Sequence, residues 1–142
     1  MRAGSKDAKA LSALVKLVWS EHSPEALTRI LKNYMASEES AVFTEIVDGE
    51  YAGVALCCLR HDYVEGCATS PVGYLEGVSI REEYRHRGIA GRLVAECEQW
   101  AREQGCTEFA SDCALTNTAS LGFHLAVGFQ EENRIICFKK TL

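Results

Sequence analysis

Residues 74–90 read YLEGVSIREEYRHRGIA, and this stretch decides the fold. Its first part, up to Ile80, predicts a β-strand. A charged turn over residues 81–88 follows. Beyond the turn, apolar residues recur on one helix face, so we expect a helix from Ile89 that ends at Gly105. The stretch therefore predicts a strand, a tight basic turn and a helix.

The basic turn has the features of an anion site. Gly88 has no Cβ, so a ligand can approach its backbone closely. The N–H groups at the start of a helix, together with the helix dipole, attract an anion. Arg85 and Arg87 add positive charge to a chain whose net charge is −5. These features suit a pyrophosphate, and the alternative is a plain strand-to-helix turn with solvated arginines.

The pattern outside this stretch predicts an α/β fold, with a mixed sheet and helices on both faces. Residues 6–20 and a segment starting at Ser23-Pro24 predict two helices, from apolar spacing and from a Ser cap followed by Pro. Asp48-Gly49 indicates a hairpin turn. The other expected elements are strands over 41–47, 51–59, 73–80 and 108–111, a helix from Thr116 or Asn117 to about Val127, and a last extended segment over 129–139. With a very short strand at the N-terminus, the expected order is β-αα-βββ-α-β-α-β.

Length and composition narrow the class of protein. With 142 residues, 47% apolar and 25% charged, the chain fits a single domain over residues 1–142. No apolar run reaches the roughly 20 residues of a membrane span, and the polar N-terminus has no signal region, so we expect a cytoplasmic protein. The negative charge argues against nucleic-acid binding and permits a cationic ligand. The seven cysteines form no CxxC pair and the four histidines no HxxxH pair, so we expect neither disulfides nor a metal site.

On these residues the chain resembles the GNAT superfamily of N-acetyltransferases. In that family an R/Q-x-x-G-x-G/A loop after a strand holds the pyrophosphate of acetyl-CoA, and residues 85–90 (RHRGIA) match it, with Ala90 in the last position. The resemblance implies that acetyl-CoA is the co-substrate and that the Val78 N–H polarises the thioester carbonyl. The positions that it assigns to cofactor binding are Val78, Ser79, Ile80, Arg85, His86, Arg87, Gly88, Ile89, Ala90, Gly91 and Asn117.

A narrower resemblance is to the aminoglycoside 6′-N-acetyltransferases. It is carried by RHDYVEGC at 60–67, YLEG at 74–77, GCTEFASD at 105–112 and the segment 124–134. It implies a small polycationic amine as acceptor, namely the 6′-amine of an aminoglycoside antibiotic. The implied substrate contacts are Trp19, His22, Tyr63, Glu76, Asp112 and Asn133. Simpler alternatives are a core aromatic at 19, a surface histidine at 22, loop packing at 63 and a turn acid or helix cap at 112.

Two residues are candidates for proton transfer. Glu76 lies in a mostly apolar strand, where an unpaired carboxylate is costly to bury. It is either a ligand for the substrate ammonium and a water-mediated base, or the partner of an arginine. His124 stands where many GNAT enzymes have a Tyr that protonates the departing thiolate, so it is either a general acid or structural. We expect direct attack within a ternary complex, with most of the rate coming from positioning.

Other functions remain open. The same cofactor site would serve an enzyme that acetylates a polyamine, a protein N-terminus or a lysine. A module that binds acetyl-CoA as a sensor, without catalysis, would not need the cation site that Glu76 and Asp112 indicate. By resemblance to related enzymes, we also expect a homodimer that docks through the C-terminal segment.

Overall fold

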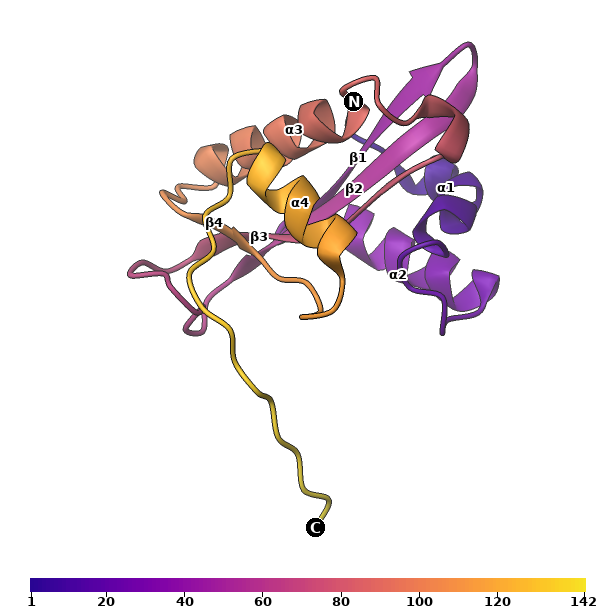
Figure 1. Ribbon diagram of the computed structural model, residues 1–142. Coiled ribbons are helices and arrows are strands. Elements are labelled where there is room, and N and C mark those ends of the chain that lie inside the picture. Colours follow the sequence, from indigo (N-terminus) through magenta and orange to yellow (C-terminus); the bar gives the residue numbers. More distant parts are fainter.

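A mixed sheet of four strands forms the centre of the computed structural model, which describes residues 1–142 (Figure 1). The strands are β1 (Ser40–Val47), β2 (Glu50–Arg60), β3 (Val72–Ile80) and β4 (Phe109–Ser111), in the order β1-β2-β3-β4. The first three pair antiparallel, and β4 pairs with β3 in parallel. Asp48 and Gly49 turn β1 into β2 with φ of 50° and 79°, as the Asp-Gly signal predicts.

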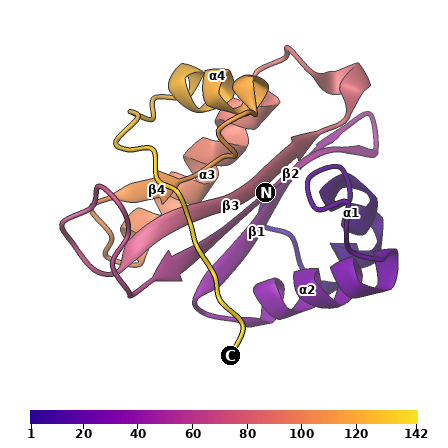
Figure 2. The same ribbon diagram turned by 60° about the horizontal axis from the view of Figure 1, so that its bottom comes forward.

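Helices cover both faces of the sheet, as Figure 2 shows. They are α1 (Ala8–Val15), α2 (Pro24–Ala36), α3 (Ile89–Glu103) and α4 (Thr118–Ala126), with short 3-10 helices at Ser5–Asp7 and Glu82–Tyr84. α1 and α2 bury Leu11 and Leu27 against Val54 on one face. α3 buries Leu93 against Leu75 on the other, and α4 lies on the same side as α3. The predicted mixed α/β architecture is confirmed.

None of these helices combines the length and the apolar character needed to cross a bilayer.

A β-bulge in β3 determines where Glu76 points. The register between β2 and β3 shifts between Leu56 and Cys57, so Glu76 is an extra residue without a partner on β2. A bulge bends the strand and re-aims the side chains beside it. Gly77 consequently lies over Trp19, whose ring is 3.8 Å from the place where a Cβ on Gly77 would be. The bulge explains how a carboxylate interrupts an otherwise apolar strand.

The structure departs from the sequence prediction at both ends of the chain. The helix expected over 6–20 is regular only over α1, and the chain turns beyond it, where the Lys16 ammonium donates to the carbonyls of Ser20 and His22. The expected N-terminal strand is a single bridge from Arg2 to Phe43. The strand expected over 129–139 is absent, and this segment runs away from the sheet (Figure 1). No edge of its own chain pairs with it, and without a partner an extended segment is not a strand.

Candidate active site

A gap opens between β3 and β4 beyond Ser111, where β4 ends while β3 continues to Ile80. The N–H of Arg81 donates to the Ala52 carbonyl of β2 at 2.9 Å. Because backbone groups alternate in direction along a strand, the N–H groups of Ile80 and Val78 point away from β2, into the gap. The gap therefore presents backbone donors along one side.

The turn between β3 and α3 presents a second set of donors. Gly88 adopts a left-handed conformation, with φ of 76°, and caps α3. The N–H groups of Ile89, Ala90 and Gly91 have no acceptor in the protein. His86 is also left-handed, with φ of 62°, which is uncommon for a residue with a Cβ and recurs at ligand sites. This end of the helix fits an anion such as a diphosphate.

Two arginines flank these donors. Arg85 Nε donates to the Ile80 carbonyl at 3.2 Å and ties the turn back to β3. The Arg87 guanidinium carbon lies 5.4 Å from the centre of the Tyr84 ring. Both side chains are exposed, so they bring positive charge to the mouth of the turn.

Glu76 is held through one of its two carboxylate oxygens. Arg60 Nη2 and Nε donate to Oε1 at 2.7 and 3.2 Å, and the Cys58 thiol donates to it at 3.2 Å. The predicted alternative of an arginine partner is therefore observed. Oε2 accepts from no protein group and is not sealed from solvent. The carboxylate thus keeps one oxygen available to a ligand.

Tyr74 connects this group to Asp112. The Arg60 guanidinium carbon lies 3.5 Å from the centre of the Tyr74 ring, and the Tyr74 hydroxyl donates to Asp112 Oδ2. Burial and the bond to Asp112 raise the pKa of Tyr74, so it stays a donor at neutral pH. Asp112 therefore binds a side chain of β3 and does not cap α4, where the capping residue is Asn117. The structure brings Glu76 and Asp112 into one cluster.

His124 hydrogen-bonds through both ring nitrogens. Nε2 lies 2.8 Å from Ser111 Oγ, and Nδ1 lies 2.6 Å from the Ser120 carbonyl oxygen. A carbonyl only accepts, so Nδ1 carries a proton. Ser111 Oγ also lies 3.0 Å from the Leu75 carbonyl, at the closed end of the gap. The Ser111 hydroxyl donates to that carbonyl and thus links His124 on α4 to β3.

Four other predicted site residues form no hydrogen bond with the Glu76 cluster. Asn117 Oδ1 caps α4 by accepting a backbone N–H at 3.0 Å. The Tyr63 side chain is 76% exposed. Asn133 donates to a glutamate of the loop before β3, and His22 Nε2 lies 3.4 Å from the carboxylate of the residue before it. Trp19, in contrast, lies under Gly77 beside the bulge.

Sequence reasoning missed three residues of the site: Arg60, Tyr74 and Ser111. Arg60 opens the RHDYVEGC block and ends β2, next to a strand that carries an interior carboxylate. An arginine at the end of one strand and an acid in the middle of the next could have predicted that the two side chains form an ion pair. Ser111 has no comparable signal, because its role depends on the contact between β4 and α4.

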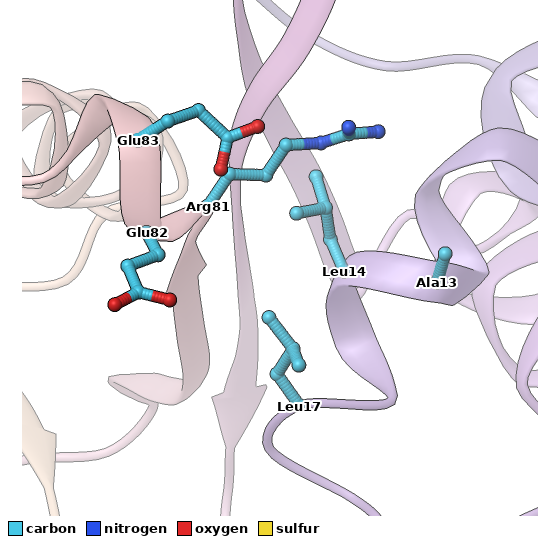
Figure 3. Close-up of a pocket in the computed structure, with 6 residues that line it drawn as sticks. All are labelled: Ala13, Leu14, Leu17, Arg81, Glu82 and Glu83. Atoms are coloured by element: carbon cyan, nitrogen blue, oxygen red, sulfur yellow. The ribbon is translucent and has the colours of Figure 1, made fainter.

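A shallow cavity of about 280 Å³ lies away from these groups, between α1 and the turn after β3 (Figure 3). Its lining residues are Ala13, Leu14, Leu17, Arg81, Glu82 and Glu83. In Figure 3 the Arg81 side chain extends toward α1 above Leu14. The cavity includes neither Glu76 nor the donors that start α3, so we do not assign the chemistry to it. All seven cysteines are free thiols, and no cluster of His, Cys, Asp or Glu has a metal-binding arrangement.

Comparison with known proteins identifies the family. Residues 9–129 match the Acetyltransferase (GNAT) family. The chain belongs to the GNAT acetyltransferase family. The GNAT resemblance predicted from residues 85–90 is confirmed, and the gap between β3 and β4 lies in the part of the chain that the family model matches.

Similar GNAT proteins carry a narrower name. An aminoglycoside N(6′)-acetyltransferase type 1 of Serratia marcescens is 40% identical over 131 residues, covering 92% of this chain and 90% of the relative. One of the same name from Acinetobacter genomosp. 13 is 41% identical over 130 residues, covering 91% and 88%. The predicted resemblance to the aminoglycoside 6′-N-acetyltransferases is therefore confirmed as well.

Solved structures of such GNAT enzymes superpose closely. AAC(6′)-Iy in complex with the bisubstrate analogue CoA-S-monomethyl-acetylneamine matches with a TM-score of 0.94 and 34% identity, over 100% of this chain and 97% of that one. AAC(6′)-IG from Acinetobacter haemolyticus matches with a TM-score of 0.95 and 32% identity, over the same shares.

Proposed function

We propose that this GNAT protein transfers an acetyl group from acetyl-CoA to the 6′-amine of an aminoglycoside antibiotic. One observation carries the proposal. On β3, donors that face the open gap at Val78 and Ile80 lie within a few residues of a carboxylate at the bulge, Glu76. An acyl donor and a cationic acceptor could therefore meet on one strand. The names of the relatives agree with this substrate pair.

The donor groups fit acetyl-CoA, which supplies the acetyl group as an activated thioester. The Val78 N–H would polarise the carbonyl as an oxyanion-hole donor. The unpaired N–H groups at the start of α3 would bind the diphosphate, aided by Arg85 and Arg87. The proposed cofactor contacts are Val78, Ser79, Ile80, Arg85, His86, Arg87, Gly88, Ile89, Ala90, Gly91 and Asn117.

The acidic cluster fits a polycationic amine. The proposed acceptor contacts are Trp19, His22, Tyr63, Glu76, Asp112 and Asn133. The amine nitrogen attacks the thioester carbonyl, and the C–S bond breaks as the C–N bond is established. The bound ammonium first gives one proton through water to Glu76 Oε2, which releases it to solvent; the second N–H proton, lost after the attack, leaves by the same route, and the departing thiolate takes a proton from His124. Most of the rate comes from holding the two substrates together.

A panel of acceptors tests the proposal. The protein is assayed with acetyl-CoA and kanamycin, spermidine or a lysine peptide, following the release of thiol. We expect turnover with kanamycin and none with an analogue that has a hydroxyl in place of the 6′-amine. Turnover of peptides or spermidine alone would make the acceptor assignment wrong, and coenzyme binding without turnover of any amine would support a sensor.

A direct transfer also predicts that no cysteine forms an acyl-enzyme. Exchanging each of the seven cysteines for Ala should leave turnover largely intact. Burial and the bond to Glu76 raise the pKa of the Cys58 thiol to about 12, so it is a poor nucleophile at neutral pH. Loss of all activity in one of these variants would contradict direct attack.

We further infer that the protein is a cytoplasmic homodimer in which residues 1–142 are one catalytic domain. The free thiols suit a reducing compartment. Ile135, Ile136 and Phe138 are 63%, 80% and 91% exposed in an extended segment. A second copy could cover these side chains, and burying apolar area is favourable by about 25 cal/mol per Å².

A further inference from the structure

The proposed binding site for the amine substrate, beside Glu76, already contains a cation. Arg60 Nη2 lies 2.7 Å from Glu76 Oε1, and its guanidinium lies over the Tyr74 ring at 3.5 Å. Stacking and pairing together hold the planar guanidinium in one orientation. The Tyr74 hydroxyl in turn binds Asp112. Two carboxylates and one guanidinium thus form a cluster that is one positive charge short of neutrality.

This arrangement bears on a difficulty of the proposed reaction. An ordinary amine is protonated at neutral pH, and an ammonium has no lone pair with which to attack. A lone carboxylate beside it would favour the ammonium further, by about one to three pKa units. Each unit leaves about tenfold less neutral amine. A guanidinium on the same carboxylate opposes this effect.

We propose that Arg60 is a positioning residue that neutralises Glu76, so that the amine held by Glu76 Oε2 can release its proton at neutral pH. This inference rests on the proposed function. Arg60 stays paired during turnover, and Asp112 supplies the unbalanced negative charge that attracts the other ammonium groups of the substrate. Attraction of the polycation and deprotonation of its reacting amine are thereby assigned to different carboxylates.

The thiol and the two phenols around Glu76 keep their protons in the working pH range, and the remaining acid of the cluster is the Asp112 carboxyl. On β2, burial and then Glu76 itself raise the pKa of the Cys58 thiol to about 12. On α2 and β3, burial is the first cause that raises the pKa values of Tyr34 and Tyr74 above their usual 10. Near the bulge, the α1 side contributes Trp19, which does not titrate. A pH profile that moves near neutral pH when Arg60 is changed would therefore report the bound amine and not the thiol or either phenol.

The test is the pH dependence of kcat with kanamycin, because kcat reports groups in the enzyme–substrate complex. In Arg60→Gln the pKa of the acidic limb should rise by about one unit, which lowers kcat about tenfold near pH 7 and restores it at higher pH. KM should fall or stay unchanged, because the ammonium binds a bare carboxylate at least as well. Arg60→Lys keeps the charge and should stay near the wild-type profile.

Two further proteins serve as controls: a variant of a surface arginine, and a variant that lacks the Glu76 carboxylate. Arg102→Gln removes an arginine that pairs with Glu98 at 3.5 Å on the surface of α3, and it should leave the profile unchanged. If Arg60→Gln does not fold, Arg60→Met is used in its place, because methionine retains an apolar side chain of similar length. In Glu76→Gln protein, a further change at Arg60 should move the profile no more.

The possible failures can be told apart. A loss of kcat that is equal at every pH in Arg60→Gln would overturn the inference, because a purely structural role predicts it. A further shift of about one unit when Arg60 is changed in the Glu76→Gln background would overturn it too, since Arg60 would then act elsewhere. A wild-type protein that acetylates no aminoglycoside at any pH would overturn the proposed function, and the inference with it.

Discussion

Two carboxylates in this protein, those of Asp7 and Glu76, differ in how many of their oxygens accept hydrogen bonds from the protein. Asp7 is buried, and both of its oxygens are engaged: Oδ1 by the Tyr51 hydroxyl at 2.6 Å and Oδ2 by the Gly4 N–H at 2.8 Å. Glu76 has all its donors on one oxygen. A fully satisfied carboxylate contributes to the fold, whereas a half-satisfied one can also receive a ligand.

Replacing Tyr51 with Phe should lower the free energy of unfolding by about 1–2 kcal/mol, because the Asp7 carboxylate loses a donor. The bonds from Tyr51 and Gly4 hold the pKa of Asp7 below its usual 3.8. Their stabilising effect is therefore present above that pH and is lost as pH falls through the folded-state pKa. Urea denaturation of both proteins near neutral pH and near pH 3 measures the difference, which should shrink in acid.

Tyr63→Phe is the control for this change, because its side chain is 76% exposed and should not affect stability. A stability difference for Tyr51→Phe that is the same at both pH values would contradict the assigned partner.

Glu76→Gln should reduce kcat/KM for an aminoglycoside on the order of a hundredfold, since both the charge and the proton acceptor are lost. The affinity for coenzyme A should not change, because Glu76 is not among the proposed coenzyme contacts. Steady-state kinetics and calorimetry measure the two effects. Glu98→Gln, on the surface of α3, is the matched control, and near-normal kinetics for Glu76→Gln would remove Glu76 from the acceptor site.

Among the elements, the strand–turn–helix unit from β3 to α3 could be predicted best. Its signals are local: the apolar run before Ile80, the glycine at 88 and the helical spacing after it. The bulge at Glu76 could not be predicted, because it depends on how β3 registers with β2. The pair of Arg60 with Glu76 depends on the same register. Residues 129–139 show the reverse case, in which the extended conformation is local but a strand requires a partner.

Gly88→Ala should raise KM for acetyl-CoA several-fold, because an alanine at φ of 76° costs about 1 kcal/mol and distorts the first turn of α3. Gly49→Ala is a matched control, with φ of 79° and open space around its Cβ. Both variants should lose similar stability in thermal melting. Only Gly88→Ala should change KM, and equal KM values would argue against the diphosphate site.

For the whole molecule, β3 carries the proposed acceptor groups on one face and the proposed coenzyme donors along its edge at the gap. Trp19 lies beside Gly77 on the side of α1, whereas the N–H groups of Val78 and Ile80 point into the gap between β3 and β4. This arrangement suits two substrates that bind at the same time and meet at β3. The face toward α4 is less complete, since no residue of α4 is buried.

Phe138→Asp should convert the proposed homodimer into a monomer, because a charge in a covered apolar segment is costly. Sedimentation analysis of the variant and the wild-type protein measures the mass. Ile46→Asp, at a 42% exposed position on β1, is the control and should leave the dimer intact. A wild-type protein that already sediments as a monomer would make the dimer prediction wrong.

Only one carboxylate oxygen of Glu76 accepts hydrogen bonds from the protein, and this has a consequence for the design of inhibitors. Amidines and guanidines usually bind a carboxylate through two parallel bonds, one to each oxygen. With Oε1 taken by Arg60 and Cys58, such a head group would gain a single bond and would bring its charge close to that of Arg60. A compact ammonium or a neutral hydroxyl needs only Oε2, so competitive blockers of this enzyme are expected to carry a small single-point donor.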